Sequence, residues 1–200
     1  MLKVRVERGG PSSGQQGHDA GFVYQLSGTQ RLIFADRVID LHAGQAALVA
    51  PAGFAHQHEV VAGASWLFLS IGDAAQTASA GTHGSVTYES AALAPLATGT
   101  HPSGAYTFGY TETLRRLELD PGARSPVHST SGYEAIYVLE GTLELRSPGR
   151  VLALPAGAGV VIEPRQSVQL VNTRSEPGRA LLFFITPGGE PYETDLPGNS

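Results

Sequence analysis

The residues best suited to chemistry lie in one stretch, from Gly122 to Gly141, which contains His128 and Glu134. These two side chains stand on either side of a Ser/Gly turn, and a β-branched and aromatic run follows them. Alternation along a strand puts His128 and Thr130 on one face, so both can point inward. Burial in an apolar interior should raise the pKa of Glu134 unless a metal or a charged His128 offsets it. Glu134 is therefore the candidate catalytic acid or base.

A second group of histidines lies in the first half of the chain. His56 and His58 are two residues apart and share a strand face, and His18 lies in the preceding Gly-rich loop. Because the chain has no cysteine, a bound metal must use histidine, carboxylate or amide ligands, and these three imidazoles are candidates. The alternative is that His56 caps its domain and His58 is solvated.

Short strands must position these side chains. Glycine (25) and proline (13) are abundant and the apolar runs are short, which is typical of an all-β chain with many tight turns. The best helix candidate, residues 90–96, is limited to a turn or two by Pro95. Strands are expected at 2–7, 22–26, 31–35, 37–41, 46–50, 56–61 and 65–71, then at 106–110, 114–119, 135–139, 142–146, 150–154, 159–163, 167–172 and 180–186.

The second half of the chain repeats the first. Three anchors recur 113 residues later, with Gly28-Thr29 matching Gly141-Thr142, Ala43-Gly44 matching Ala156-Gly157, and Pro51 matching Pro164. A constant spacing of this kind indicates internal duplication. We therefore expect an N-terminal domain at residues 1–75, an Ala/Thr/Ser/Gly-rich linker at 76–103, a C-terminal domain at 104–188 and a loose tail at 189–200.

The stretch that contains His128 resembles the first motif of the cupin family, G-x5-H-x-H-x3/4-E-x6-G. Gly122, His128, Glu134 and Gly141 match this motif, whereas Thr130 stands at the second histidine. Together with the repeat, the resemblance implies two tandem jelly-roll β-barrels, an arrangement called a bicupin. It also implies a divalent metal inside the barrel, held in a typical cupin by the two histidines and the glutamate of this motif and by one histidine of a second motif.

The second motif, G-x5-P-x-G-x2-H-x3-N, is incomplete in the C-terminal copy. Gly157 and Pro164 match it. The histidine position is Gln169 if the duplication spacing is followed, or Val168 if four residues are counted back from Asn172. Neither residue is a histidine, so His128 and Glu134 are either a weak metal site or a hydrogen-bonded pair inherited from one.

The N-terminal copy shows the reverse pattern. Its second motif is retained at Gly44, Pro51, Gly53 and His56. Its first motif retains only Gly28, and Gly21 stands at the glutamate position. His18 lies near the position of the first histidine and could complete a site with His56 and His58.

Three classes of function remain open. The favoured one is binding of a small organic molecule within a barrel, through residues drawn from His128, Thr130, Gln169 and Tyr137. The alternative is a metal-dependent enzyme of dioxygenase or isomerase type, with iron, manganese, nickel or zinc bound by the candidate ligands named above. The third is a non-catalytic structural or interaction role, with side chains filling both barrels. Whether the chain is an enzyme is left undecided.

Composition narrows the partners. The chain carries 13 basic and 18 acidic residues, giving a net charge of −5 with no basic cluster, so we expect no nucleic-acid partner. No apolar run of membrane-spanning length and no signal-peptide pattern occurs, so we expect a soluble cytoplasmic protein without a membrane partner. A homodimer through an exposed sheet edge is left open.

Overall fold

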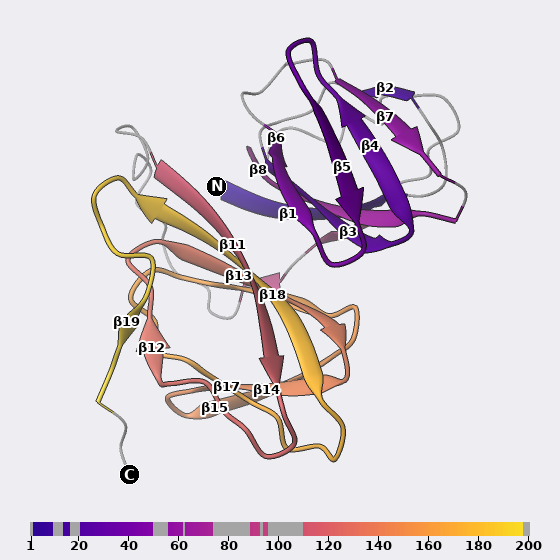
Figure 1. The fold of residues 1–200 in the computed structure, drawn as a ribbon. Coiled ribbons are helices and arrows are strands. Elements are labelled where there is room, and N and C mark those ends of the chain that lie inside the picture. Colours follow the sequence, from indigo (N-terminus) through magenta and orange to yellow (C-terminus); the bar gives the residue numbers. More distant parts are fainter. Residues whose placement is uncertain are drawn as a thin grey trace. The chain divides into compact units, whose positions relative to one another are not determined.

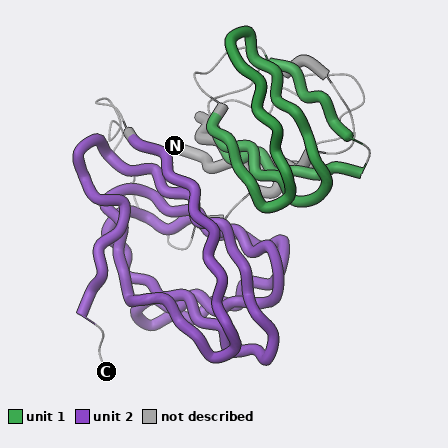
Figure 2. The backbone as a smooth tube through the Cα atoms, in the orientation of Figure 1, with its two compact units in different colours: residues 1–92 green, residues 93–200 purple. Residues whose placement is uncertain are grey.

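The computed structural model describes residues 2–9, 14–16, 21–49, 56–61, 63–73, 89–92, 94–95 and 110–197. These residues form strands, turns and irregular connections, and no helix occurs among them (Figure 1). The all-β prediction is therefore confirmed. No helix in the described ranges has the length and apolar character needed to cross a membrane. The chain divides into two compact units, unit 1 at residues 1–92 and unit 2 at residues 93–200 (Figure 2).

Unit 1 consists of two sheets that share one apolar core. One sheet has the strand order β6-β3-β8-β1-β9 and the other has the order β2-β7-β4-β5. The core draws on strands of both sheets and includes Leu32, Trp66 and Phe68. The strands are β1 (Leu2–Gly9), β2 (Gly14–Gln16), β3 (Gly21–Ser27), β4 (Thr29–Ile33), β5 (Val38–His42), β6 (Ala46–Val49), β7 (His56–Val60), β8 (Ser65–Asp73) and β9 (Glu89–Ala92).

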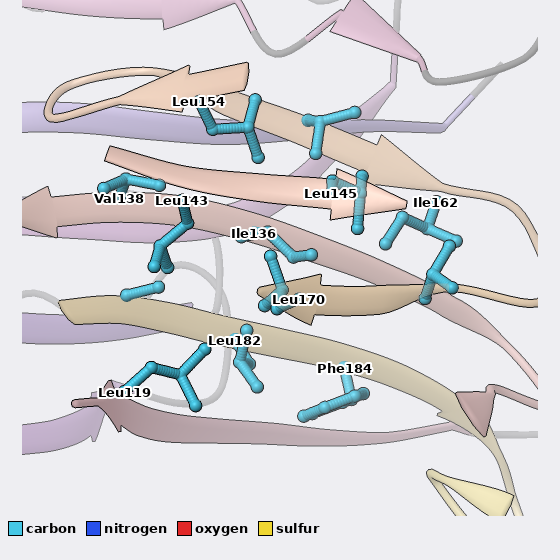
Figure 3. Packing of buried hydrophobic residues seen from close by; sticks show 13 residues of the cluster. Leu119, Ile136, Val138, Leu143, Leu145, Leu154, Ile162, Leu170, Leu182 and Phe184 are labelled. Atoms are coloured by element: carbon cyan, nitrogen blue, oxygen red, sulfur yellow. The ribbon is translucent and has the colours of Figure 1, made fainter. Parts of the chain in front are cut away.

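Unit 2 has one large sheet, of order β10-β16-β13-β18-β11, and two smaller ones, β15-β14-β17 and β12-β19. Figure 3 shows its core, in which Ile136 and Leu182 of the large sheet lie close to Leu145 and Leu170 of the three-stranded sheet. The strands are β10 (Ala94–Pro95), β11 (Tyr110–Leu119), β12 (His128–Ser129), β13 (Tyr133–Glu140), β14 (Thr142–Ser147), β15 (Arg150–Pro155), β16 (Gly159–Ile162), β17 (Gln169–Val171), β18 (Gly178–Pro187) and β19 (Thr194–Asp195).

The two units share strand order and register. The order β6-β3-β8-β1 recurs as β16-β13-β18-β11, and β7-β4-β5 recurs as β17-β14-β15. A register shift in the β3–β8 ladder lies between Gln25 and Ser27, and its counterpart in β13–β18 lies between Val138 and Glu140, again 113 residues later. The next turn begins at Gly28 in one unit and Gly141 in the other, both at positive φ (69° and 77°), a conformation that favours glycine.

Two segments differ from the expectations. The helical turn expected at residues 90–96 is wrong for the described part, because β9 extends the sheet edge at β1 and β10 extends the edge at β16. An unpaired edge offers backbone donors and acceptors that a short segment can satisfy without a helix. In the segment where a loose tail was expected, β19 pairs with β12, and the Leu196 N–H donates to the Val127 carbonyl (2.8 Å) (Figure 1).

Candidate functional site

His128 and Glu134 meet in the interior of unit 2. His128 Nε2 lies 3.3 Å from Glu134 Oε2, and the two residues are 2% and 0% exposed. The tight turn between β12 and β13 makes this approach possible. A Cβ on Gly132 would lie 1.8 Å from the Ile185 carbonyl oxygen, so the turn passes against β18 where no side chain fits. The hydroxyl of Thr130 donates to the Gly132 carbonyl (2.8 Å) and braces the same turn.

The His128–Glu134 pair holds one proton between its facing atoms. The Pro126 carbonyl can only accept, so the contact with His128 Nδ1 (3.2 Å) makes that nitrogen the donor. The Nε2 contact then needs a proton, either on the imidazole or on the carboxyl of Glu134. Burial raises the pKa of Glu134, although its hydrogen bond to His128 opposes this shift. Burial acts to lower the pKa of His128, but the hydrogen bond and charge of Glu134 outweigh it, and the pKa is raised to about 8.

The second carboxyl oxygen of Glu134 is buried without a partner. Glu134 Oε1 accepts no hydrogen bond from the described residues. Its strand neighbours across the sheet are Ile162 and Phe184, which cannot donate through their side chains. Buried polar atoms in proteins are almost always satisfied, so this oxygen can accept a hydrogen bond from a donor that the described residues do not supply.

Sequence reasoning missed two residues of this site, Arg115 and Glu193. Arg115 pairs with the core residue Leu182 across β11–β18, so both side chains lie on the inner face of the sheet. Its guanidinium Nη1 lies 3.2 Å from Glu193 Oε2 and 3.2 Å from the hydroxyl of Tyr192. Glu193 Oε1 also lies 3.9 Å from His128 Nδ1. Four charged or chargeable groups therefore alternate in sign from the surface inward, in the order Arg115, Glu193, His128, Glu134.

The missed residues differ in how visible they are in the sequence. Arg115 lies two residues before Leu117, which packs against the core, and four before the core residue Leu119, so strand alternation could have placed it on the inner face. Glu193 carries no comparable signal, because its position depends on the pairing of β19 with β12, far away in the sequence.

Two expected ligand-binding residues lie elsewhere. Gln169 alternates with the core residues Val168 and Leu170, and its amide donates to the Ser125 carbonyl (2.9 Å). Tyr137 alternates with Ile136 and Val138 and thus lies on the face of β13 opposite Glu134. The structure brings together His128, Thr130 and Glu134, but places Gln169 and Tyr137 on other faces of their strands.

The histidine position of the second motif in unit 2 is Val168. The register pairs are Leu32–His58 for β4–β7 and Leu145–Leu170 for β14–β17. The spacing between β7 and β17 is therefore 112 rather than 113, and His56 corresponds to Val168. Of the two positions that the sequence left open, the structure selects the apolar one.

In unit 1, His56 and His58 are both buried and begin a chain of hydrogen bonds. The two Nε2 atoms are 2.9 Å apart, and His58 Nδ1 lies 2.8 Å from Gln30 Oε1. Gln30 Nε2 donates to Gln25 Oε1 (2.6 Å), and Gln25 Nε2 donates to the Ser27 carbonyl (2.7 Å). This direction makes His58 Nδ1 the donor. His18 lies outside the described residues.

The side chains that form this series of hydrogen bonds in unit 1 have apolar counterparts in unit 2. At the spacings set by the registers, Gln25, Gln30, His56 and His58 correspond to Val138, Leu143, Val168 and Leu170. All four counterparts belong to the unit 2 core. The fold therefore does not require polar side chains at these positions.

The two units offer different sets of possible ligands for a divalent metal. In unit 2, the imidazole of His128 and the carboxyl group of Glu134 face each other. The hydroxyl of Thr130 is hydrogen-bonded to the Gly132 carbonyl, and Val168 stands at the histidine position of the second motif. Two donors do not make up the three or four protein ligands that such sites use, so this set does not fit a metal. In unit 1, His56 and His58 fit two ligand positions. No group of three or more His, Asp or Glu residues suited to a metal occurs in the described part of the chain.

Comparison with known proteins agrees with the architecture. Residues 115–186 match the family model described as a cupin domain. No protein of curated function matches the chain. The formate complex of the oxalate decarboxylase from Lactobacillus farciminis is 12% identical with a TM-score of 0.69, and the match covers 97% of this chain and 80% of that one.

Two further solved structures show the same fold. The oxalate decarboxylase from Bacillus subtilis, described as having Mn(II) centres, is 15% identical with a TM-score of 0.69, over 97% of this chain and 71% of that one. AerE from Microcystis aeruginosa is 14% identical with a TM-score of 0.59, over 88% of this chain and 83% of that one. At these identities the likeness concerns the fold alone. Residues 115–186 are thus similar to a cupin domain, and the chain shares its fold with these solved structures.

Proposed function

We propose that this chain is a bicupin, with two tandem cupin barrels, and that the C-terminal barrel binds a small organic molecule against His128 and Glu134. The repeated strand order, the matched register shifts and the paired positive-φ glycines support the duplication. A homodimer and a cytoplasmic location remain predictions.

The unpartnered oxygen of Glu134 carries the binding proposal. Leaving such an atom buried and unsatisfied costs about 1–3 kcal/mol. A ligand hydroxyl, amine or amide N–H that donates to Oε1 would remove this cost. The ligand should therefore be a small molecule with at least one donor group, held in a largely apolar barrel.

The same geometry could support acid–base chemistry. The proton between His128 Nε2 and Glu134 Oε2 can lie on either group, and the pKa of each residue is raised above its ordinary value. If a reaction occurs, Glu134 would hold or deliver the proton, while His128, fixed by the Pro126 carbonyl, would orient it.

The binding proposal can be tested by thermal unfolding with a panel of small alcohols, amines and organic acids. We expect at least one compound to raise the melting temperature of the wild type, and Glu134→Gln to weaken its binding about tenfold or more. Glu176→Gln, at an exposed position of unit 2, is the matched control and should bind as the wild type does. Unchanged binding by Glu134→Gln would refute the role assigned to Glu134.

The second candidate function is that of a metal-dependent enzyme, in which His56 and His58 would supply two ligands and His18, which lies outside the described residues, would supply the third. The hydrogen bond from His58 Nδ1 to Gln30 fixes the orientation of the imidazole ring. Histidines that bind a metal usually donate their other ring N–H to a neighbouring acceptor in the same way. A divalent metal there would supply Lewis-acid or redox chemistry. Elemental analysis of the wild type, purified without chelator or affinity metal, should show bound metal. His56→Ala and His58→Ala should lose this metal, and the exposed control His42→Ala should keep it. Absence of metal in the wild type after incubation with iron, manganese, nickel or zinc would refute this candidate.

A further inference from the structure

The carboxylate of Glu193 lies between the guanidinium of Arg115 and the imidazole of His128 at the edge of the unit 2 site. One carboxylate oxygen contacts the Arg115 guanidinium (3.2 Å), and the other lies 3.9 Å from His128 Nδ1. The ring nitrogen of His128 that faces Glu193 carries a proton, because it donates to the Pro126 carbonyl. A carboxylate held between a guanidinium and a protonated ring nitrogen is bound by the kinds of donor that would bind a small organic acid.

We propose that Arg115 and His128 form a binding site for the carboxylate of a small organic acid, and that Glu193 occupies this site as a displaceable substitute. This inference rests on the proposed function and names its substrate class. An acid bound in this way would place its own carboxylate where that of Glu193 now lies.

The segment that carries Glu193 has few attachments. Apart from those of Glu193 itself, its contacts with the described residues include the two-residue β12–β19 pairing, a hydrogen bond from Leu196 to Val127, one from Ser131 to the Pro191 carbonyl, and the contacts of Tyr192 with Arg115 and Phe184. The Arg115 side chain is 49% exposed and that of Glu193 is 19% exposed. Ion pairs that are open to solvent contribute little stability, so a competing carboxylate can replace Glu193 at low cost.

Chemical rescue tests this inference directly. Glu193→Ala removes the internal carboxylate and leaves room for acetate, the probe. We expect acetate to raise the melting temperature of Glu193→Ala by about 2 °C or more, with a Kd at least about tenfold lower than for the wild type. Acetamide, which has the same shape without the charge, and sodium chloride at equal ionic strength should have no such effect.

Matched variants separate the site from general effects. Glu190→Ala removes an exposed carboxylate from the same segment and should respond to acetate as the wild type does. The double variant Arg115→Gln/Glu193→Ala should lose the rescue. If Glu193→Ala does not fold, acetate titration of Glu193→Gln, followed by NMR of the His128 imidazole, gives the same comparison.

The outcomes are distinct. Rescue of Glu193→Ala by acetate, lost with Arg115→Gln, supports the inference. Equal responses of wild type and variant, or equal responses to acetamide and acetate, would show that Glu193 is only a structural anchor. If rescue fails while Glu134→Gln still weakens ligand binding, the inference fails and the proposed function stands. If rescue succeeds while Glu134→Gln binds ligand normally, the Arg115–His128 site stands and the binding role proposed for Glu134 fails.

Discussion

At the residue scale, the site consists of a few buried groups whose protonation depends on one another. His128 and Glu134 both have raised pKa values, so the folded unit binds more protons at these positions than the unfolded chain does. For such groups, stability is highest at low pH and falls as pH rises through the folded-state pKa.

We predict that unit 2 loses stability between pH 6.5 and about 8. The pKa of His128 rises from 6.5 in the unfolded chain to about 8, so its contribution is complete below pH 6.5 and is lost above about 8. The loss should be about 2 kcal/mol. Amide hydrogen exchange in β13 and β18 at several pH values measures it, and His128→Gln should abolish it. Burial also raises the pKa of Glu112 from 4.5 to about 7, so unit 2 should lose further stability over this lower pH range. This second loss of stability should persist in His128→Gln.

The residues of this site were predictable to different degrees. The spacing of His128 and Glu134 within a strand–turn–strand pattern places them together, because the turn is local. Arg115 and Glu193 meet 78 residues apart, through a short strand that no periodic pattern marks. The constant spacing of 113 made Gln169 the counterpart of His56. The connection that precedes β17 is one residue shorter than the one before β7, so the true counterpart is Val168.

At the element scale, the turn between β12 and β13 controls the geometry of the site. Gly132 lies against the Ile185 carbonyl of β18, and the Thr130 hydroxyl donates to the Gly132 carbonyl. The local sequence Ser131-Gly132 predicts a turn here, but the need for glycine comes from the Ile185 carbonyl, which belongs to a distant strand.

We predict that Gly132→Ala destabilises the chain by about 3 kcal/mol or more, because the added methyl group overlaps backbone that cannot move freely. Urea unfolding measures the loss. The control is Gly149→Ala, at a glycine of positive φ (72°) with open space around its Cβ. It should cost only the backbone strain of about 1–2 kcal/mol. Equal costs for the two variants would contradict the steric argument.

At the scale of the whole molecule, two units of one architecture have different interiors. Unit 1 carries a buried hydrogen-bonded chain where unit 2 has valine and leucine. The all-β class and most strands of unit 2 follow from apolar alternation and turn residues. The hydrogen-bonded chain could not be predicted, because Gln25 and Gln30 acquire a role only when the β3–β4 hairpin brings them beside β7.

We predict that Gln30→Leu, which introduces the residue found in unit 2, destabilises the chain by about 1–3 kcal/mol, because Gln25 and His58 each lose a buried partner. Replacing all four side chains together, by Gln25→Val, Gln30→Leu, His56→Val and His58→Leu, should recover most of this loss. Denaturant unfolding followed by Trp66 fluorescence measures both changes. The exposed control Gln57→Leu should have little effect. A combined variant less stable than Gln30→Leu alone would contradict the argument.

The two-residue pairing of β19 with β12 also has a kinetic consequence. If Glu193 must leave before an acid can bind, the protein alternates between a closed and an open state, and only the open state accepts the ligand. The observed association rate would then stop rising at high ligand concentration, at a plateau equal to the opening rate of the segment. In Glu193→Ala this plateau should move to a higher rate. The segment that carries Glu193 would therefore set the association rate of the ligand as well as its affinity.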